Sequence, residues 1–109
     1  MVELKLGDKE FSLATNLRVA YNVQGQHNHK SYMEIFKSVD SMHLEDQVGI
    51  LYEAAKVGTP DMKLTRKEFF ELYLDSADAN VTNLMRILKS IFEGVLGRKI
   101  ETPEETSGE

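Results

Sequence analysis

The side chains best suited to chemistry in this sequence are two histidines, His27 and His29, which flank Asn28 in the polar stretch GQHNHK (25–30). Alternate residues of an extended chain project to the same side, so both imidazoles could face one metal ion. Zinc requires three or four protein ligands, and no further ligand follows at a suitable spacing. We therefore interpret 25–30 as a solvated loop and expect no metal site.

A second polar group, Asp75, Asp78 and Asn80, resembles a fragment of a calcium-binding loop. The spacing differs from that of such loops, the required glycine is missing, and no bidentate glutamate follows at the twelfth position. Aspartate and asparagine are also preferred residues before a helix. We interpret this stretch as a junction between helices, with Asp78 or Asn80 as the N-cap.

No motif for nucleophilic catalysis or phosphate binding is present: the sequence contains neither G-x-G-x-x-G nor G-x-S-x-G, and it has no cysteine. Its acids and bases show no spacing that would bring them together. We expect a protein that is not an enzyme and that uses no cofactor, and an uncharacterised enzyme remains the residual alternative.

The elements that must position any binding surface begin with VELKLGDKEFSL (2–13). Apolar residues alternate with charged ones on both sides of Gly7-Asp8, which predicts a β-hairpin. Its inner face should pack on helices, because a hairpin alone is only marginally stable. Its edges should stay free to pair with a second copy or a partner strand, and we expect self-association along Val2, Leu4 and Leu6.

Helical spacing follows the hairpin and continues to Leu96. The patterns S-x-x-E (31–34) and T-x-x-E (65–68) predict two capping boxes, and Asn16 is a third N-cap. Five helices are expected, at about 16–24, from Ser31, at 43–57, from Thr65 and at 80–96, with Gly25, Gly58 and Gly97 as stops. The first should bury one face, formed by Leu17, Ala20, Tyr21 and Gln24.

Two of these helices have more apolar surface than one buried face needs. In the fourth, Phe69, Leu72 and Tyr73 form one stripe, and Phe70, Leu74 and Ala77 form another about 100° away. The third helix has a weaker second stripe of Ile50, Ala54 and Val57. Each second stripe either packs inside the domain or contacts another protein. Our candidates for such contacts are Phe70, Leu74 and Ile50.

The fold class predicted is α+β and mostly α, with one domain over 1–100: a hairpin at 1–14 and a helical body at 15–100. The last nine residues (101–109) form an acidic tail that we expect to be disordered.

Without the four glutamates of this tail, 13 basic and 14 acidic residues remain, a net charge of −1. So neutral a domain is a poor match for nucleic acid. No apolar stretch predicts a membrane span or a signal peptide, so we expect a cytoplasmic protein.

Two stretches carry a resemblance to a known family: the opening VELKLGDKEFSL and, inside 48–73, the run GILYEAAKVGTPDMKLTRKEFFELY. Their pattern and order, followed by an amphipathic helix and an acidic tail, resemble the tail assembly chaperones of long-tailed bacteriophages and prophages of Gram-positive hosts. The resemblance covers most of the chain and contains no catalytic signature.

The resemblance implies a non-enzymatic protein of the bacterial host cytoplasm that coats the helical tape measure protein, helps to recruit tail tube subunits and is absent from the finished particle. It also implies that a longer, frameshifted form can branch off near the acidic tail. Two further alternatives are a structural particle subunit, such as a connector, that self-associates through the hairpin, and a small DNA-binding domain.

Overall fold

The computed structural model describes residues 2–99, and it begins with the predicted hairpin. Strands β1 (Val2–Leu6) and β2 (Lys9–Leu13) pair antiparallel, with Val2 opposite Leu13 and Leu6 opposite Lys9. The two-residue loop places Gly7 at a φ of +65°, the left-handed region that a type II′ turn requires at this position. The hairpin prediction is confirmed, and the described residues form no other strand.

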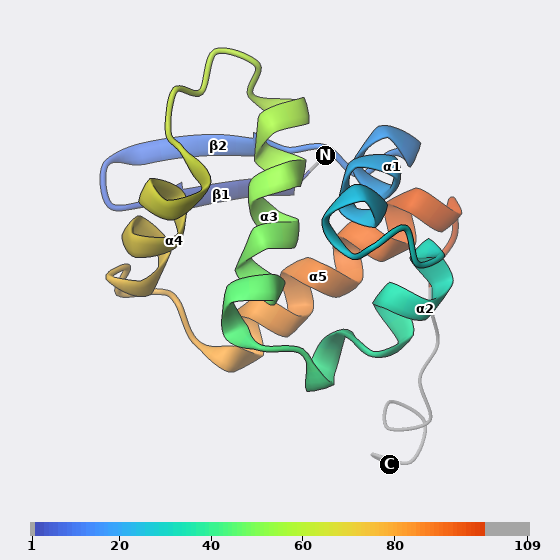
Figure 1. The fold of residues 1–109 in the computed structure, drawn as a ribbon. Coiled ribbons are helices and arrows are strands. Elements are labelled where there is room, and N and C mark those ends of the chain that lie inside the picture. The colour runs from blue at the N-terminus through green and yellow to red at the C-terminus, as the bar shows by residue number, and fades with distance from the viewer. Residues whose placement is uncertain (1, 100–109) are drawn as a thin grey trace.

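The rest of the described chain is helical, as the sequence predicts, and packs with the hairpin into one compact α+β domain (Figure 1). The helices are α1 (Leu17–Gln26), α2 (Tyr32–Lys37), a 3-10 turn (Val39–Ser41), α3 (Leu44–Gly58), α4 (Arg66–Leu74) and α5 (Val81–Leu96). The predicted tail (101–109) lies outside the described residues.

Polar caps fix where the helices begin. The Glu68 amide donates to Thr65 Oγ1 at 3.1 Å, and the Thr65 amide donates to Glu68 Oε1 at 2.8 Å, which forms the predicted capping box of α4. Ser31 and Glu34 form the same motif at α2. Asn16 and Asn80 cap α1 and α5 through their side chains. The predicted starts are therefore confirmed at these four helices.

Helix α3 forms the centre of the core, with β2, α1, α4 and α5 packed around it. Because neighbours surround it, α3 buries both of its apolar stripes, and Ile50 and Ala54 are 1% and 0% exposed. The prediction that Ile50 contacts a partner is wrong. The second stripe of α3 is part of the core because β2, α1, α4 and α5 pack around this helix.

The predicted face of α1 is also wrong. Leu17 and Tyr21 are 67% and 69% exposed, whereas Val19, Ala20 and Val23 are buried. The helix packs against α3, α2 and α5 through these buried residues. The buried face of α1 is therefore rotated around the helix axis relative to the predicted face. Gly25 does not end α1, which continues for one more residue, to Gln26.

The outer edge of β2 is covered by the end of α3, so the prediction that both hairpin edges stay free is wrong. Thr59 Oγ1 accepts a hydrogen bond from the Ser12 amide at 2.8 Å and lies 3.1 Å from the Ser12 carbonyl, to which it can donate. One turn earlier, the Ala54 carbonyl accepts from the Ala14 amide at 3.0 Å. At Gly58 a Cβ atom would overlap the Ser12 carbonyl oxygen, so glycine permits this close approach.

Candidate functional site

The predicted contact residues divide among three places in the structure. Phe70 and Leu74 lie on α4, where Phe70 is half-buried and Leu74 is 43% exposed. Ile50 is inside the core, as described above. On β1, Val2 is half-buried, whereas Leu4 and Leu6 are buried at 8% and 1% exposure. The Leu4 and Leu6 side chains therefore belong to the core, which leaves the strand's backbone edge as the surface to consider.

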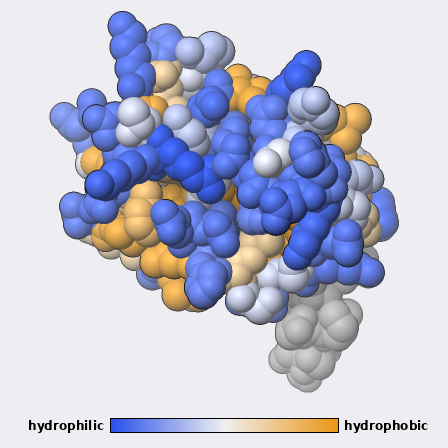
Figure 2. Space-filling view, viewed as in Figure 1, coloured by the Kyte–Doolittle hydropathy of each residue, from blue (hydrophilic) through white to orange (hydrophobic). Residues whose placement is uncertain are grey.

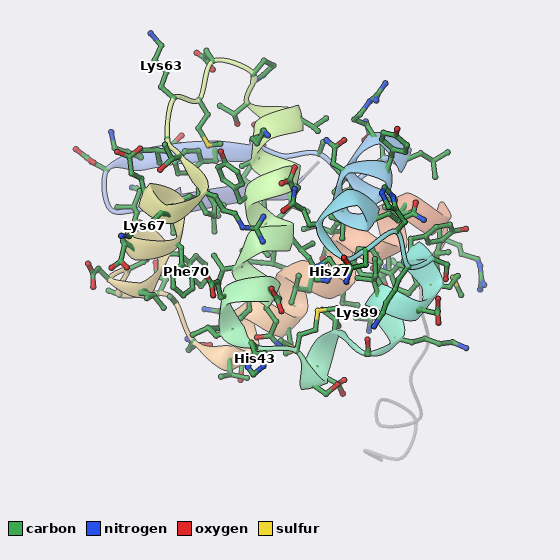
Figure 3. All side chains as sticks on the ribbon, in the orientation of Figure 1. His27, His43, Lys63, Lys67, Phe70 and Lys89 are labelled. Carbon is green, nitrogen blue, oxygen red and sulfur yellow. The ribbon has the colours of Figure 1, made fainter. Side chains whose placement is uncertain are left out.

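Phe70 lines a hollow between α3 and α4, which we call the Phe70 groove. Helix α4 turns Phe69 and Tyr73 into the core, and Phe70 follows about 100° further round the helix. Figure 3 places Phe70 on the side of α4 that faces α3. The groove has a volume of about 340 Å³ and is lined by Glu45, Val48, Gly49, Arg66, Lys67, Phe70 and Glu71.

The lining of the Phe70 groove combines an apolar part with charges of both signs. Phe70 and Val48 supply the apolar part, and Glu45, Lys67 and Glu71 are exposed charged residues beside them. Such a mixture suits an amphipathic helix, which inserts apolar side chains and meets the rim charges with its own polar flanks. The lining of the groove is therefore suited to binding an amphipathic helix.

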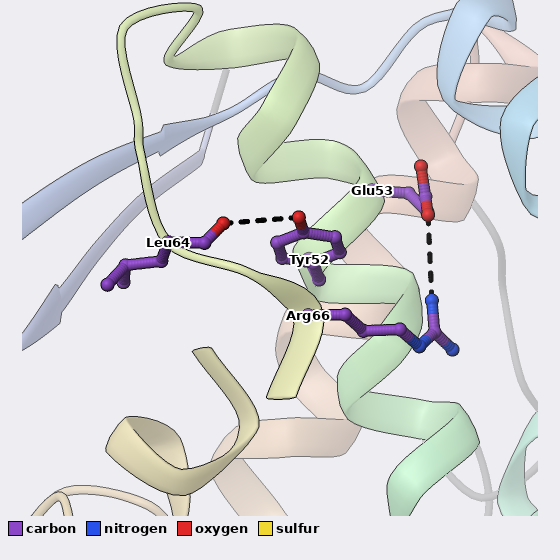
Figure 4. A network of polar contacts seen from close by, with 4 residues as sticks. All are labelled: Tyr52, Glu53, Leu64 and Arg66. Carbon is purple, nitrogen blue, oxygen red and sulfur yellow. Dashed lines mark hydrogen bonds and ion pairs between the residues drawn. The ribbon is translucent and has the colours of Figure 1, made fainter. Parts of the chain in front are cut away.

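One wall of the groove is fixed by a charged contact across α3. The Arg66 guanidinium passes over Gly49, where a Cβ atom would overlap it, and reaches Glu53 with Nη1 3.5 Å from Oε2 (Figure 4). The Glu53 side chain is only 5% exposed, and Arg66 is 35% exposed. Arg66 Nη1 makes no hydrogen bond, so this is an ion pair without hydrogen-bond geometry. It offsets the burial of the Glu53 carboxylate.

A neighbouring contact holds the start of α4 against α3. The Tyr52 hydroxyl donates to the Leu64 carbonyl at 3.2 Å (Figure 4). The Tyr52 ring also lies 5.6 Å from that of Phe69, centroid to centroid. With the ion pair of Arg66, this contact fixes the spacing between the two helices. The Phe70 groove is thus held open by residues of α3 and α4 and does not depend on a mobile loop.

Apolar side chains extend the surface beyond the groove. Leu44, Leu74 and Val81 are 44%, 43% and 71% exposed, at the start of α3, the end of α4 and the start of α5. Figure 2 shows hydrophobic residues gathered at the lower left of the molecule, where Figure 1 draws these helix ends. Exposed apolar residues that gather in this way are typical of a protein-binding surface.

A second hollow, of about 390 Å³, runs along β1, and we call it the β1-edge hollow. Its lining combines all of β1 with the α4–α5 junction and one face of α5: Val2, Glu3, Leu4, Lys5, Leu6, Tyr73, Ser76, Asp78, Ala79, Asn83, Arg86, Ile87 and Ser90. The hollow therefore lies where the edge of β1 meets the α4–α5 junction and one face of α5.

Tyr73 is the unusual residue of this second hollow. It is 4% exposed, and within the described part of the chain its hydroxyl has no hydrogen-bond partner. Burial raises the pKa of the Tyr73 phenol above its ordinary value of 10.0. Spacing along α4 places Tyr73 on the same stripe as Phe69, but its unpaired hydroxyl could not be predicted, because that depends on which polar groups the fold brings near it.

The two polar clusters, at 25–30 and 75–80, assemble no metal site. Asn28 and His29 adopt φ values of 58° and 61° in the turn after α1. Asn80 accepts from the Asn83 amide at 2.8 Å, which confirms it as an N-cap. Over residues 2–99, no group of three or more His, Cys, Asp or Glu side chains could hold a metal ion.

None of the helices in the described range is both long and apolar enough to cross a membrane. No family model, curated protein or solved structure matches this chain.

Proposed function

We propose that this protein is a non-enzymatic tail assembly chaperone of a long-tailed bacteriophage or prophage, which binds the tape measure protein and helps to recruit tail tube subunits in the host cytoplasm. The observation that carries the proposal is the Phe70 groove, with exposed Leu74 beside it on the same helix. The resemblance of the stretches 2–13 and 48–73 to such chaperones supplies the identity of the partner.

The partner's chemistry fits the groove. A tape measure protein before assembly is a long helix with apolar stripes, which would aggregate if left uncovered. A groove with an apolar floor and charges of both signs can cover one segment of such a stripe. Many copies along one long helix would each bind with modest affinity and together keep it in solution.

The test is co-expression with the tape measure protein of the same phage or prophage. The wild type should raise the soluble yield of that protein, and Phe70→Asp should bind it about 30-fold more weakly, the loss typical of a central interface residue. Leu17→Asp is the matched control, because Leu17 is 67% exposed on α1 and lies outside the groove. Circular dichroism of each variant checks that the fold is kept.

Phe70 is half-buried, so its substitution could also disturb the core. Leu74→Asp, at a side chain 43% exposed, separates the two effects and should reduce binding with the fold intact. Equal solubilisation by the wild type and by the Phe70 and Leu74 variants would refute the groove as the binding site.

The uncovered edge of β1 favours a second candidate function, a structural particle subunit that self-associates through the hairpin. Mass spectrometry of purified particles distinguishes the two functions. A chaperone should be missing from finished particles, and a retained protein would support the structural subunit.

A further inference from the structure

The edges of the hairpin differ in what covers them. In a hairpin with a two-residue loop, the residues next to the loop, Leu6 and Lys9, form a hydrogen-bonded pair, and the bonding then alternates along the strands. Ser12 therefore points its amide and carbonyl away from β1, and Thr59 meets both. On β1, Glu3 lies opposite Ser12. The backbone amides and carbonyls of Glu3 and Lys5 point away from β2, toward the open edge of β1.

No group in residues 2–99 bonds to the outward amides and carbonyls of Glu3 and Lys5. The β1-edge hollow lies along this edge, and one face of α5 lines it as well. An unpaired edge of this kind is a template for one more strand. Glu3 and Lys5 are also both exposed residues.

The charges on β1 identify which strand fits. Glu3 and Lys5 stand on either side of Leu4, and both side chains lie on the exposed face of the sheet. In an antiparallel pairing with a second copy of β1, a two-fold axis at Leu4 places Glu3 of each copy opposite Lys5 of the other. The pairing therefore contains two pairs of opposite charges. The shifted antiparallel registers centred on Glu3 or Lys5, and the in-register parallel pairing, set like charges against each other, which is unfavourable.

The hydrogen-bonding pattern selects the same register. Glu3 and Lys5 are the two residues of β1 whose backbone groups point outward, and in this arrangement they face each other as hydrogen-bonded pairs. The alternation of charge also extends across the sheet, because Lys5 already lies opposite Glu10 within the hairpin. Backbone bonding and side-chain charge thus agree on one pairing.

We propose that two copies of this chain join β1 to β1 in this register and form a four-stranded antiparallel sheet. The interface is independent of the Phe70 groove, so it can be present whether or not the protein binds a tape measure protein.

Charge reversal tests the register. Lys5→Glu and Glu3→Lys should each weaken self-association by about tenfold, because two attractive pairs become repulsive. The double variant Glu3→Lys, Lys5→Glu restores opposite charges and should recover most of the affinity. Sedimentation velocity at low ionic strength measures this, because salt screens exposed charges.

A matched control separates this effect from damage to the hairpin. Glu10→Lys creates like charges inside the hairpin, opposite Lys5, and lies on β2, away from the proposed interface. It should leave self-association within about twofold of the wild type. A similar loss in Glu10→Lys and Lys5→Glu would overturn the proposed register.

Cysteine pairs supply a second measurement, because the sequence has no cysteine of its own. An equal mixture of Glu3→Cys and Lys5→Cys chains should form a disulfide-linked dimer, since the Cα atoms of such a pair lie about 5.5 Å apart. Lys5→Cys alone should not form it, because Lys5 is not opposite itself. A wild-type chain that stays monomeric at the highest soluble concentration would refute the proposal, and so would equal cross-linking in the two samples.

Discussion

The buried hydroxyl of Tyr73 makes stability sensitive to alkaline pH. Above pH 10.0, the ordinary pKa of a phenol, the unfolded chain releases this proton while the folded chain keeps it, because burial raises the pKa of Tyr73. The free energy of unfolding therefore falls as the pH rises through this range, until the folded phenol also ionises. Tyr73→Phe removes this contribution, so the variant should lose less stability than the wild type between pH 8 and pH 11.

Urea unfolding followed by circular dichroism at both pH values measures this difference. Tyr21→Phe is the control, because the Tyr21 ring is 69% exposed, and it should follow the wild type. At neutral pH, Tyr73→Phe should raise the free energy of unfolding by up to about 1 kcal/mol, because it removes an unpaired buried hydroxyl. An identical pH dependence in Tyr73→Phe and the wild type would show that the hydroxyl finds a partner.

Single residues also show what the sequence could predict. Thr65, Glu68, Ser31 and Glu34 act within three residues of each other, so their capping boxes were predictable from local spacing. Ile50 could not be assigned in this way. Its burial depends on which elements pack on both sides of α3, and spacing along one helix contains no information about that.

At the scale of elements, the contact between α3 and β2 is the most sensitive to change. At Gly58 a Cβ atom would overlap the Ser12 carbonyl oxygen, and neither backbone can move without separating strand from helix. Gly58→Ala should therefore lower the free energy of unfolding by about 1–3 kcal/mol, as overpacking does. Thermal or chemical unfolding measures this loss.

Gly25→Ala is the matched control for the same substitution. Position 25 lies inside α1, and a Cβ atom there meets nothing within 4 Å. Alanine should stabilise this helix by about 0.5–1 kcal/mol. The two variants should change stability in opposite directions, and a stabilised Gly58→Ala would contradict the close approach.

The sequence predicted the elements better than their faces. Hydrophobic alternation located the hairpin, and spacing located α3, α4 and α5 with small errors at their ends. In α1, the two large apolar residues Leu17 and Tyr21 led to the prediction of the wrong buried stripe. In the structure, the smaller residues Val19, Ala20 and Val23 fill the space beside α3. Close packing selects side chains by fit, whereas a sequence pattern registers only their hydrophobicity. The Phe70 groove was predicted only as a surplus of apolar residues on α4.

At the scale of the whole molecule, the hairpin and the helices should unfold as one unit. Ala14 donates to Ala54, and Ser12 is bonded to Thr59, so β2 depends on a helix far along the chain. A hairpin alone is marginally stable, and this one buries Leu13 completely against the helices. The Ser12 and Ala14 amides should therefore exchange with solvent at the same free energy as core amides of α3.

Native-state hydrogen exchange followed by NMR measures these free energies directly. The amides of α1's first turn supply an internal comparison, since a helix end frays without global unfolding. If Ser12 and Ala14 exchanged several kcal/mol more easily than the α3 core, the hairpin would be a separate cooperative unit.

The unequal edges of the hairpin determine how far an assembly could grow. A sheet with two open edges can add strands on both sides, which is how fibres grow. Here Thr59 covers the edge of β2 at Ser12, whereas the edge of β1 is unpaired at both Glu3 and Lys5, and pairing about a two-fold axis uses up that edge in both molecules. An assembly through the β1 edge would therefore stop at two chains. Thr59→Val would remove the bonds to Ser12, while the hydrogen bond from Ala14 to Ala54 would still hold the end of β2 against α3.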